Sequence, residues 1–68
     1  MNKFGERLRE LRTDNCYSRA QLAKNLNVSA RLIAYWENGQ RECSFDTLIS
    51  IAELFGTSTD FLLGKSDY

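Results

Sequence analysis

The sequence lacks histidine and proline, and its 68 residues include only two cysteines and four glycines. Without histidine, a serine, cysteine or carboxylate nucleophile lacks its commonest general base. There is also no glycine-rich phosphate loop and no motif of paired catalytic carboxylates. These absences argue against an enzyme.

Cys16 and Cys43 are too few for a tetrahedral zinc site, and no neighbouring residue has ligand spacing. We therefore expect no metal and no cofactor. A disulfide between the two is the less favoured alternative, because a pair of reduced thiols filling small packing positions suits a cytosolic protein better.

Long apolar runs are missing as well. No segment approaches the roughly 20 apolar residues of a membrane span, and the first residues mix both charge signs instead of forming a signal peptide. The chain is 43% hydrophobic and 26% charged, which is ordinary for a globular protein. We expect one cytoplasmic domain over residues 1–68, with a small core and no membrane contact.

The net charge is zero, but its distribution is uneven. Up to Arg41 the chain has eight basic and four acidic residues, a net charge of +4. From Glu42 onward it has one basic and five acidic residues, a net charge of −4. Such a chain can press its basic half onto a polyanion while the acidic half faces away.

Serines and glycines divide the chain into helices. Ser18, Ser29, Ser44 and Ser58 each precede a helical pattern, where a hydroxyl caps a free backbone N–H group, and Ser18 with Gln21 forms a capping box. Asn27 and the glycines at 39, 56 and 64 are typical of helix ends. No strand-like alternation is present. We predict helices at about 3–14, 19–26, 30–38, 45–55 and 59–63.

Helical spacing also predicts the core. The residues expected to be buried are Phe4, Leu8, Leu11, Leu22, Ala23, Leu26, Val28, Ile33, Trp36, Phe45, Leu48, Ile51, Ala52, Phe55, Phe61 and Leu62.

The segment 19–36 is the most informative, because it is typical of two short helices joined by a tight turn. Its apolar residues share one side, and Ala23 is small where two steeply crossed helices approach most closely. The side chains left to face outward are those of Arg19, Ala30, Arg31, Ala34 and Tyr35. A helix held on a core and offering side chains outward fits the major groove of DNA.

These residues resemble a known family, the helix-turn-helix domains of phage repressor and Cro type (lambda-repressor-like). The matching segments cover nearly the whole chain: Leu11-Arg12, Leu22-Ala23 with Leu26, Val28-Ser29, Ile33, Trp36-Glu37-Asn38-Gly39, Ile51-Ala52-Glu53-Leu54-Phe55-Gly56 and Asp60-Phe61-Leu62-Leu63-Gly64. The resemblance implies an all-α, compact five-helix fold with the helix-turn-helix at the second and third helices.

The resemblance also implies a function: a transcriptional regulator, here a repressor, that binds a palindromic double-stranded operator as a homodimer. The implied base-reading residues are Ala30, Arg31, Ala34 and Tyr35, with Arg31 suited to guanine and Ala30 to a thymine methyl group. Phosphate contacts are expected from Arg19, Ser29, Asn38, Gln40 and Arg41. Arg12 and Glu37 match a scaffold ion pair. We expect the dimer contact at Phe61, Leu62, Leu63 and Tyr68, because so small a domain leaves apolar groups uncovered.

Several alternatives remain open. Tyr35 could instead be a partly buried ring beside Trp36, and Phe61 and Leu62 could simply close the core. The whole scaffold could serve as a protein-interaction or antitoxin module with secondary DNA contacts, which the neutral net charge and the small Ala30 and Ala34 favour. Within the DNA-binding hypothesis, a phage repressor, a Cro-like protein and a restriction–modification controller are all compatible with the sequence.

Overall fold

The structure of the protein is a computed structural model, which describes residues 2–67. It has five helices: α1 (Phe4–Asp14), α2 (Arg19–Leu26), α3 (Ala30–Glu37), α4 (Phe45–Phe55) and α5 (Thr59–Leu63). Each lies within one residue of its predicted range. No strand occurs between residues 2 and 67, so the prediction of an all-α, five-helix fold is confirmed. No helix in that part of the chain has the length and apolar character needed to cross a membrane.

All four predicted serine caps are present. The hydroxyls of Ser18, Ser29, Ser44 and Ser58 each accept a hydrogen bond from the backbone N–H three residues later. The capping box is complete, since the backbone N–H of Ser18 donates to Gln21 Oε1 at 2.8 Å. The turn between α2 and α3 is closed by Asn27, whose φ of 60° is the left-handed conformation that asparagine tolerates best after glycine. Local sequence signals therefore determine where these helices start and where α2 ends.

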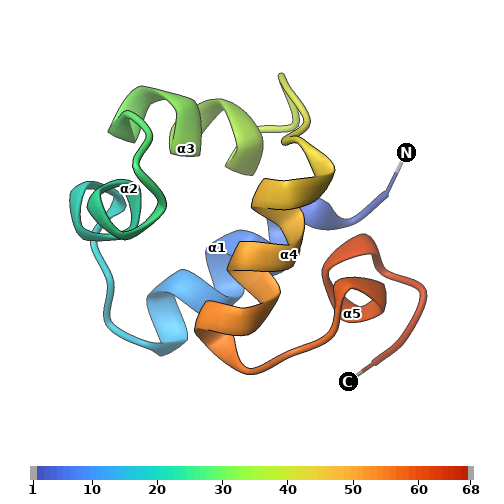
Figure 1. Ribbon diagram of the computed structural model, residues 1–68. Coiled ribbons are helices and arrows are strands. Elements are labelled where there is room, and N and C mark those ends of the chain that lie inside the picture. Colours follow the sequence, from blue (N-terminus) through green and yellow to red (C-terminus); the bar gives the residue numbers. More distant parts are fainter. Residues whose placement is uncertain (1, 68) are drawn as a thin grey trace.

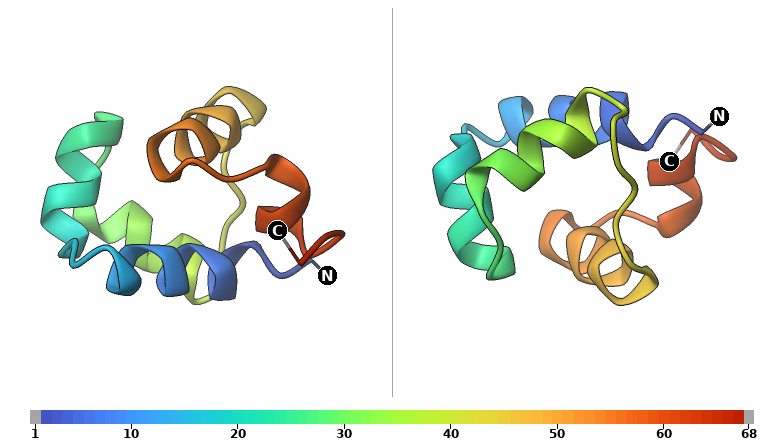
Figure 2. Two further views of the ribbon diagram at one scale, coloured as in Figure 1. Left: turned by 90° about the horizontal axis from the view of Figure 1, so that it is seen from below. Right: turned by 90° about the horizontal axis from the view of Figure 1, so that it is seen from above.

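The helices pack around one core (Figures 1 and 2). The helix α1 lies against α3 and α5, α2 packs on α3, and α4 packs on α5 and α2. In Figure 1, α3 lies at the top, away from α5, and a loop at its right-hand end leads into α4. The buried core consists of Phe4, Leu8, Leu22, Ala23, Ile33, Trp36, Leu48, Ile51, Ala52 and Leu62. Leu11, Leu26, Val28 and Phe55 are half-buried and pack against this core.

Gly5 sets the distance between α1 and α3. A Cβ atom built on Gly5 would lie 2.5 Å from the carbonyl oxygen of Trp36 and 2.8 Å from that of Glu37. These distances are shorter than any van der Waals contact, and the atoms met belong to backbone, which cannot rotate away. The first turn of α1 can therefore lie on the end of α3 only because residue 5 has no side chain.

The prediction that Phe45 is buried was wrong, because its side chain is 86% exposed. Phe45 shares the helical spacing of Leu48, Ala52 and the rest of the buried face of α4. Side chains lean toward the N-terminus of their helix, however, and Phe45 is the first residue of α4. Its ring therefore extends beyond the edge of the core.

The cysteines are both free, as expected, but only one fills a packing position. Cys43 is half-buried against the core, and this burial, together with the charge of Glu42, raises the pKa of its thiol to about 11. Cys16 is exposed in the α1–α2 loop, with a φ of 61°. The prediction that Cys16 is a packing residue was therefore wrong. None of the described residues form a group of three or more side chains able to hold a metal.

Candidate nucleic-acid interface

The helix α3 has two distinct sides. Ile33 and Trp36 are buried in the core, with 0% and 2% of their surface exposed. On the other side Ala30 and Arg31 are exposed, and Ala34 and Tyr35 are half-buried. All four residues predicted to read bases thus belong to the side of α3 that the core leaves at least partly accessible.

Four of the predicted DNA-contacting residues line one open hollow beside α3. Its walls are formed by Ser29, Arg31, Leu32, Tyr35 and Arg41, and its volume is about 370 Å³. The guanidinium carbon of Arg41 lies 5.4 Å from the centre of the Tyr35 ring, within cation–π distance. The loop between α3 and α4 therefore places a second positive charge, that of Arg41, on the surface that carries Arg31.

Three of the predicted phosphate ligands, Ser29, Asn38 and Gln40, lie at the two ends of α3. The Ser29 hydroxyl accepts a hydrogen bond from the Leu32 N–H at 3.1 Å and so caps the helix. Only its remaining hydrogen-bonding capacity can serve a ligand. At the other end, Asn38 and Gln40 are exposed. The Oδ1 atom of Asn38 accepts a hydrogen bond of 3.4 Å from Arg9, which leaves the amide group of Asn38 as a donor toward solvent.

Behind α3, a buried carboxylate holds three helices together. The side chain of Glu37 is 0% exposed and faces Arg12 from α1, at 2.6 Å from Nε to Oε2 and 3.2 Å from Nη2 to Oε1. Arg19 from α2 adds contacts of 3.0 and 3.1 Å, and Arg9 from α1 lies at 3.5 Å. Arg12 also donates to the carbonyl oxygen of Tyr17 at 3.0 Å. The predicted ion pair of Arg12 with Glu37 is therefore present, as part of a larger Glu37 cluster.

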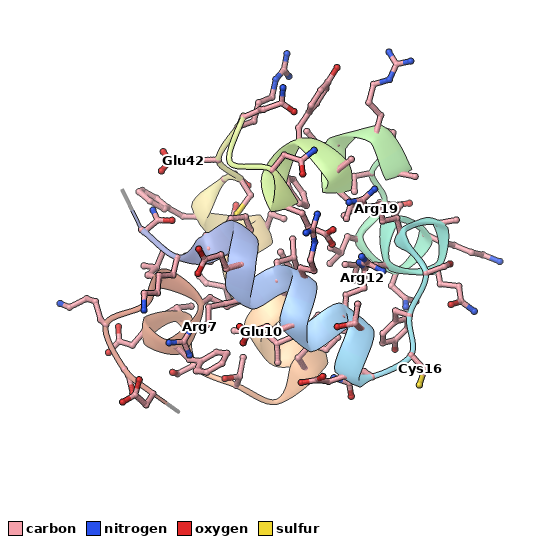
Figure 3. All side chains as sticks on the ribbon, turned by 180° about the vertical axis from the view of Figure 1, so that it is seen from behind. Arg7, Glu10, Arg12, Cys16, Arg19 and Glu42 are labelled. Atoms are coloured by element: carbon pink, nitrogen blue, oxygen red, sulfur yellow. The ribbon has the colours of Figure 1, made fainter. Side chains whose placement is uncertain are left out.

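Arg19 and Arg9 join this cluster without having been predicted to do so. Figure 3 shows Arg12 and Arg19 close together between α1 and α2. Arg19 was predicted as a phosphate ligand, but two of its nitrogens bind Glu37 and its side chain is 38% exposed. Its first role is structural, and only the remaining N–H groups can face a phosphate. A sequence signal could have indicated this role for Arg9. It is three residues from Arg12, and this spacing places the two side chains next to each other on one side of α1.

The Glu37 carboxyl has a lowered pKa. Burial alone raises this pKa, but hydrogen bonds from Arg12 and Arg19, together with their positive charges, lower it by more. A carboxyl with a lowered folded-state pKa adds stability above its unfolded pKa of about 4.3, and that stability is lost as the pH falls through the folded-state value.

We therefore expect the urea midpoint of unfolding to fall steeply below about pH 4, as Glu37 becomes protonated in the folded state. The measurement is urea unfolding followed by tryptophan fluorescence at a series of pH values. The matched control is the Glu10→Gln variant, which loses an exposed carboxylate of α1 and should show the same acid-induced decrease as the parent protein. A clearly smaller decrease in Glu10→Gln would show that exposed carboxylates carry the effect.

The residues predicted to form a dimer contact are not a continuous apolar surface. Leu62 is fully buried in the core, so it has no surface to offer a second chain, and its assignment to an interface is corrected. Phe61 is half-buried under the guanidinium of Arg7, which lies 4.2 Å from its ring centre. Leu63 is half-buried against the core, and Tyr68 lies outside the described residues. Among residues 2–67, the large apolar side chains that are exposed are instead those of Phe45, Ile49 and Leu54, all on α4.

Comparisons with known proteins agree with this arrangement. The chain is 35% identical over 64 residues to the HTH-type transcriptional regulator ImmR of Bacillus subtilis, a match that covers 94% of this chain and 50% of ImmR. The chain thus spans about half the length of this relative. The solved structure of the P22 c2 repressor in complex with synthetic operator 9T matches with a TM-score of 0.87 and 29% identity, over 97% of this chain and 100% of that one.

A third match belongs to an enzyme. Hydroxypropylphosphonic acid epoxidase from S. wedmorenis superposes with a TM-score of 0.82 and 33% identity, over 91% of this chain but only 33% of that one. The matched region is therefore a minor part of the epoxidase.

The family comparison covers the elements described above. The family model described as Helix-turn-helix matches residues 8–62, a range that begins within α1 and ends within α5. The matched range includes the capped α2–α3 unit and the Glu37 cluster's Arg9, Arg12 and Arg19. The resemblance predicted from the sequence is thereby confirmed, and this chain belongs to the helix-turn-helix family.

Proposed function

We propose that this domain is a sequence-specific, double-stranded DNA-binding regulator of transcription that acts as a repressor. In this proposal α3 enters the major groove, and two copies of the chain bind a palindromic operator in the cytoplasm. No catalytic step is assigned to it. The observation that carries the proposal is the accessible surface formed by Arg31 and Tyr35 of α3 with Arg41 of the following loop, while the other side of α3 is buried in the core.

Each residue on this surface has a chemical role. Arg31 is exposed and can donate two parallel hydrogen bonds to the O6 and N7 atoms of guanine. Ala30 presents a methyl group to a thymine methyl, and Ala34 leaves room for the groove wall. Tyr35 can reach a base edge or a phosphate, with its ring held by Arg41.

Phosphate binding falls to the residues around the ends of α3. Arg41 and Gln40 follow α3 in an exposed loop, and Asn38, whose Oδ1 accepts from Arg9, keeps its amide group as a donor. These contacts fix the position of α3 on the duplex without reading sequence. Cationic contacts with phosphates release counterions, so affinity should fall steeply with salt.

Support for this function also comes from the relatives. The P22 c2 repressor was solved with a synthetic operator, and this chain spans that whole repressor domain at 29% identity. ImmR is named a transcriptional regulator. Repression rather than activation is the part of the proposal that follows from the likeness to the repressor.

The first experiment is an unbiased selection of bound duplexes from a random library, followed by affinity measurements on the selected site. For Arg31→Ala we expect a loss of about 10- to 100-fold in affinity for that site, and relaxed preference at one base pair. For Arg41→Ala we expect weaker binding to all sequences and a shallower salt dependence. Lys65→Ala is the control for loss of a positive charge, because Lys65 follows α5, away from α3.

The same variants separate the alternative of a protein-interaction or antitoxin module. Arg19→Ala is unsuitable, because Arg19 also holds Glu37 and its loss would mix folding with binding. If no motif is enriched at moderate salt, and if Arg31→Ala binds DNA as well as the parent protein does, then α3 does not read DNA and the proposal fails.

A further inference from the structure

Arg9 is the third guanidinium near Glu37, and folding stability does not account for it. Arg12 and Arg19 reach the Glu37 carboxylate at 2.6 and 3.0 Å, so this negative charge already faces two positive charges at short range. Arg9 lies farther away, at 3.5 Å from Nε to Oε1, and its side chain is 53% exposed. A charge pair with one partner so exposed to water contributes little to folding. The position of Arg9 therefore favours a role at the surface.

The other contact of Arg9 joins α1 to the residue at the end of α3. Its Nη2 atom donates a hydrogen bond of 3.4 Å to Oδ1 of Asn38, which is 29 residues away in the sequence. The two helices pack together, and their close approach at Gly5 brings α1 beside this end of α3 (Figure 2). Asn38 is the C-cap residue of α3, where its backbone N–H donates to the Ala34 carbonyl oxygen at 3.0 Å. The backbone of Asn38 thus serves the helix, and its side chain faces Arg9.

We infer that Arg9 is a positioning residue, which orients the side-chain amide of Asn38 so that its NH2 group faces a DNA phosphate. A guanidinium has donors and no acceptor, so it can bind only the oxygen end of the amide. A phosphate has only acceptors, so it must meet the nitrogen end. If the amide turned round, its oxygen would face the negative charge of the phosphate. The inference rests on the proposed function, because the group it orients toward is a phosphate of the bound duplex.

Glu37 in turn restrains Arg9. The Glu37 carboxylate is 0% exposed and is held by Arg12 and Arg19, and its Oε1 atom faces the Nε atom of Arg9. An unbroken series of polar contacts therefore leads from the buried carboxylate through Arg9 to Asn38 at the surface. Ordering the donor before DNA arrives lowers the side-chain entropy that binding would otherwise cost. The positive charge of Arg9 also suits the neighbourhood of a phosphate.

The experiment is a double-mutant cycle of Arg9→Ala and Asn38→Ala, measured as affinity for a DNA duplex. For Arg9→Ala we expect binding about 3- to 10-fold weaker than in Lys65→Ala, which measures the loss of a distant positive charge. In the Asn38→Ala background, the change at Arg9 should have no effect beyond that of Lys65→Ala, because no amide is left to orient. An equal loss in both backgrounds would show that Arg9 contacts a phosphate by itself, and would overturn the inference.

Neutral phosphates identify the group that Asn38 meets. Duplexes are made with an uncharged methylphosphonate in place of one phosphate at a time. We expect one position at which neutralisation weakens binding by the parent protein but weakens it less in Asn38→Ala and in Arg9→Ala. A merely structural effect of Arg9→Ala would instead weaken binding while keeping the parent's pattern of sensitive positions, and this result would also overturn the inference.

The design separates the inference from the proposed function. Phosphate contacts do not depend on sequence, so the cycle and the phosphate scan can be run on a non-operator duplex at low salt if selection enriches no motif. A further measurement needs no DNA: NMR relaxation of the Asn38 side-chain amide should show it to be more ordered than that of Asn25, an exposed asparagine of α2. This order should be lost in Arg9→Ala and kept in Lys65→Ala. An Asn38 amide as mobile in the parent protein as in Arg9→Ala would overturn the inference, even if the domain binds its operator as proposed.

Discussion

Changing Glu37 to glutamine should remove most of the stability of this domain. The substitution keeps the size of the side chain but replaces its charge with a neutral amide, at a site that three guanidinium groups face. Removing one partner of a buried ion pair leaves the other charges uncompensated and costs about 3–5 kcal/mol. For a chain of 68 residues this is comparable to the whole free energy of unfolding.

This loss of stability also affects the proposed DNA surface on α3, because the Glu37 cluster joins α3 to both α1 and α2. The measurement is urea unfolding at neutral pH, followed by the fluorescence of the buried Trp36. Glu10→Gln is the matched control, since Glu10 is an exposed carboxylate on α1 and its loss should change the free energy of unfolding by less than about 0.5 kcal/mol. If the two variants unfold at the same urea concentration, the buried carboxylate does not hold the helices together.

Gly5→Ala is expected to have the second large effect. Whether it raises or lowers the free energy of unfolding distinguishes local helix propensity from packing against α3. Inside a helix, alanine is more favourable than glycine by about 1 kcal/mol, so local propensity alone predicts a more stable protein. In this fold the new Cβ would lie 2.5 Å from one backbone oxygen of α3 and 2.8 Å from the next. We expect a net destabilisation of about 3 kcal/mol, because α1 must move away from α3. Thermal unfolding followed by circular dichroism measures the change.

Gly39→Ala separates this steric effect from backbone strain. Gly39 has a φ of +75°, but a Cβ atom there meets nothing within 4 Å. Its substitution should cost only about 1–2 kcal/mol, the penalty of the left-handed conformation. If Gly5→Ala proves more stable than the parent protein, or no less stable than Gly39→Ala, the close approach of α1 and α3 does not limit residue 5.

The limits of the helices could be predicted well because their signals are local. A serine three residues before a free N–H group, or an asparagine that tolerates the left-handed conformation, acts within one turn of the chain. The pattern also separated the two sides of α3 correctly, since helical spacing decides which side chains share a side. These predictions required no knowledge of how the helices pack.

Predictions that depended on the edge of the core were less successful. Phe45 and Leu62 have equally apolar side chains in regular helical patterns, yet one is 86% exposed and the other fully buried. Periodicity states which direction a side chain takes, but not whether another helix lies in that direction. The same reason explains Arg19, whose guanidinium is drawn to a carboxylate 18 residues away in the sequence.

The five helices, their caps and the outward side of α3 can be predicted from neighbouring residues, and the pairing of Arg12 with Glu37 can be predicted from family likeness. Packing of the helices was needed to show that three arginines surround Glu37, that Gly5 sets the approach of α1 to α3, and that Phe45 is left uncovered. Each of these depends on distances between segments remote in the chain, and such distances exist only once the helices have packed.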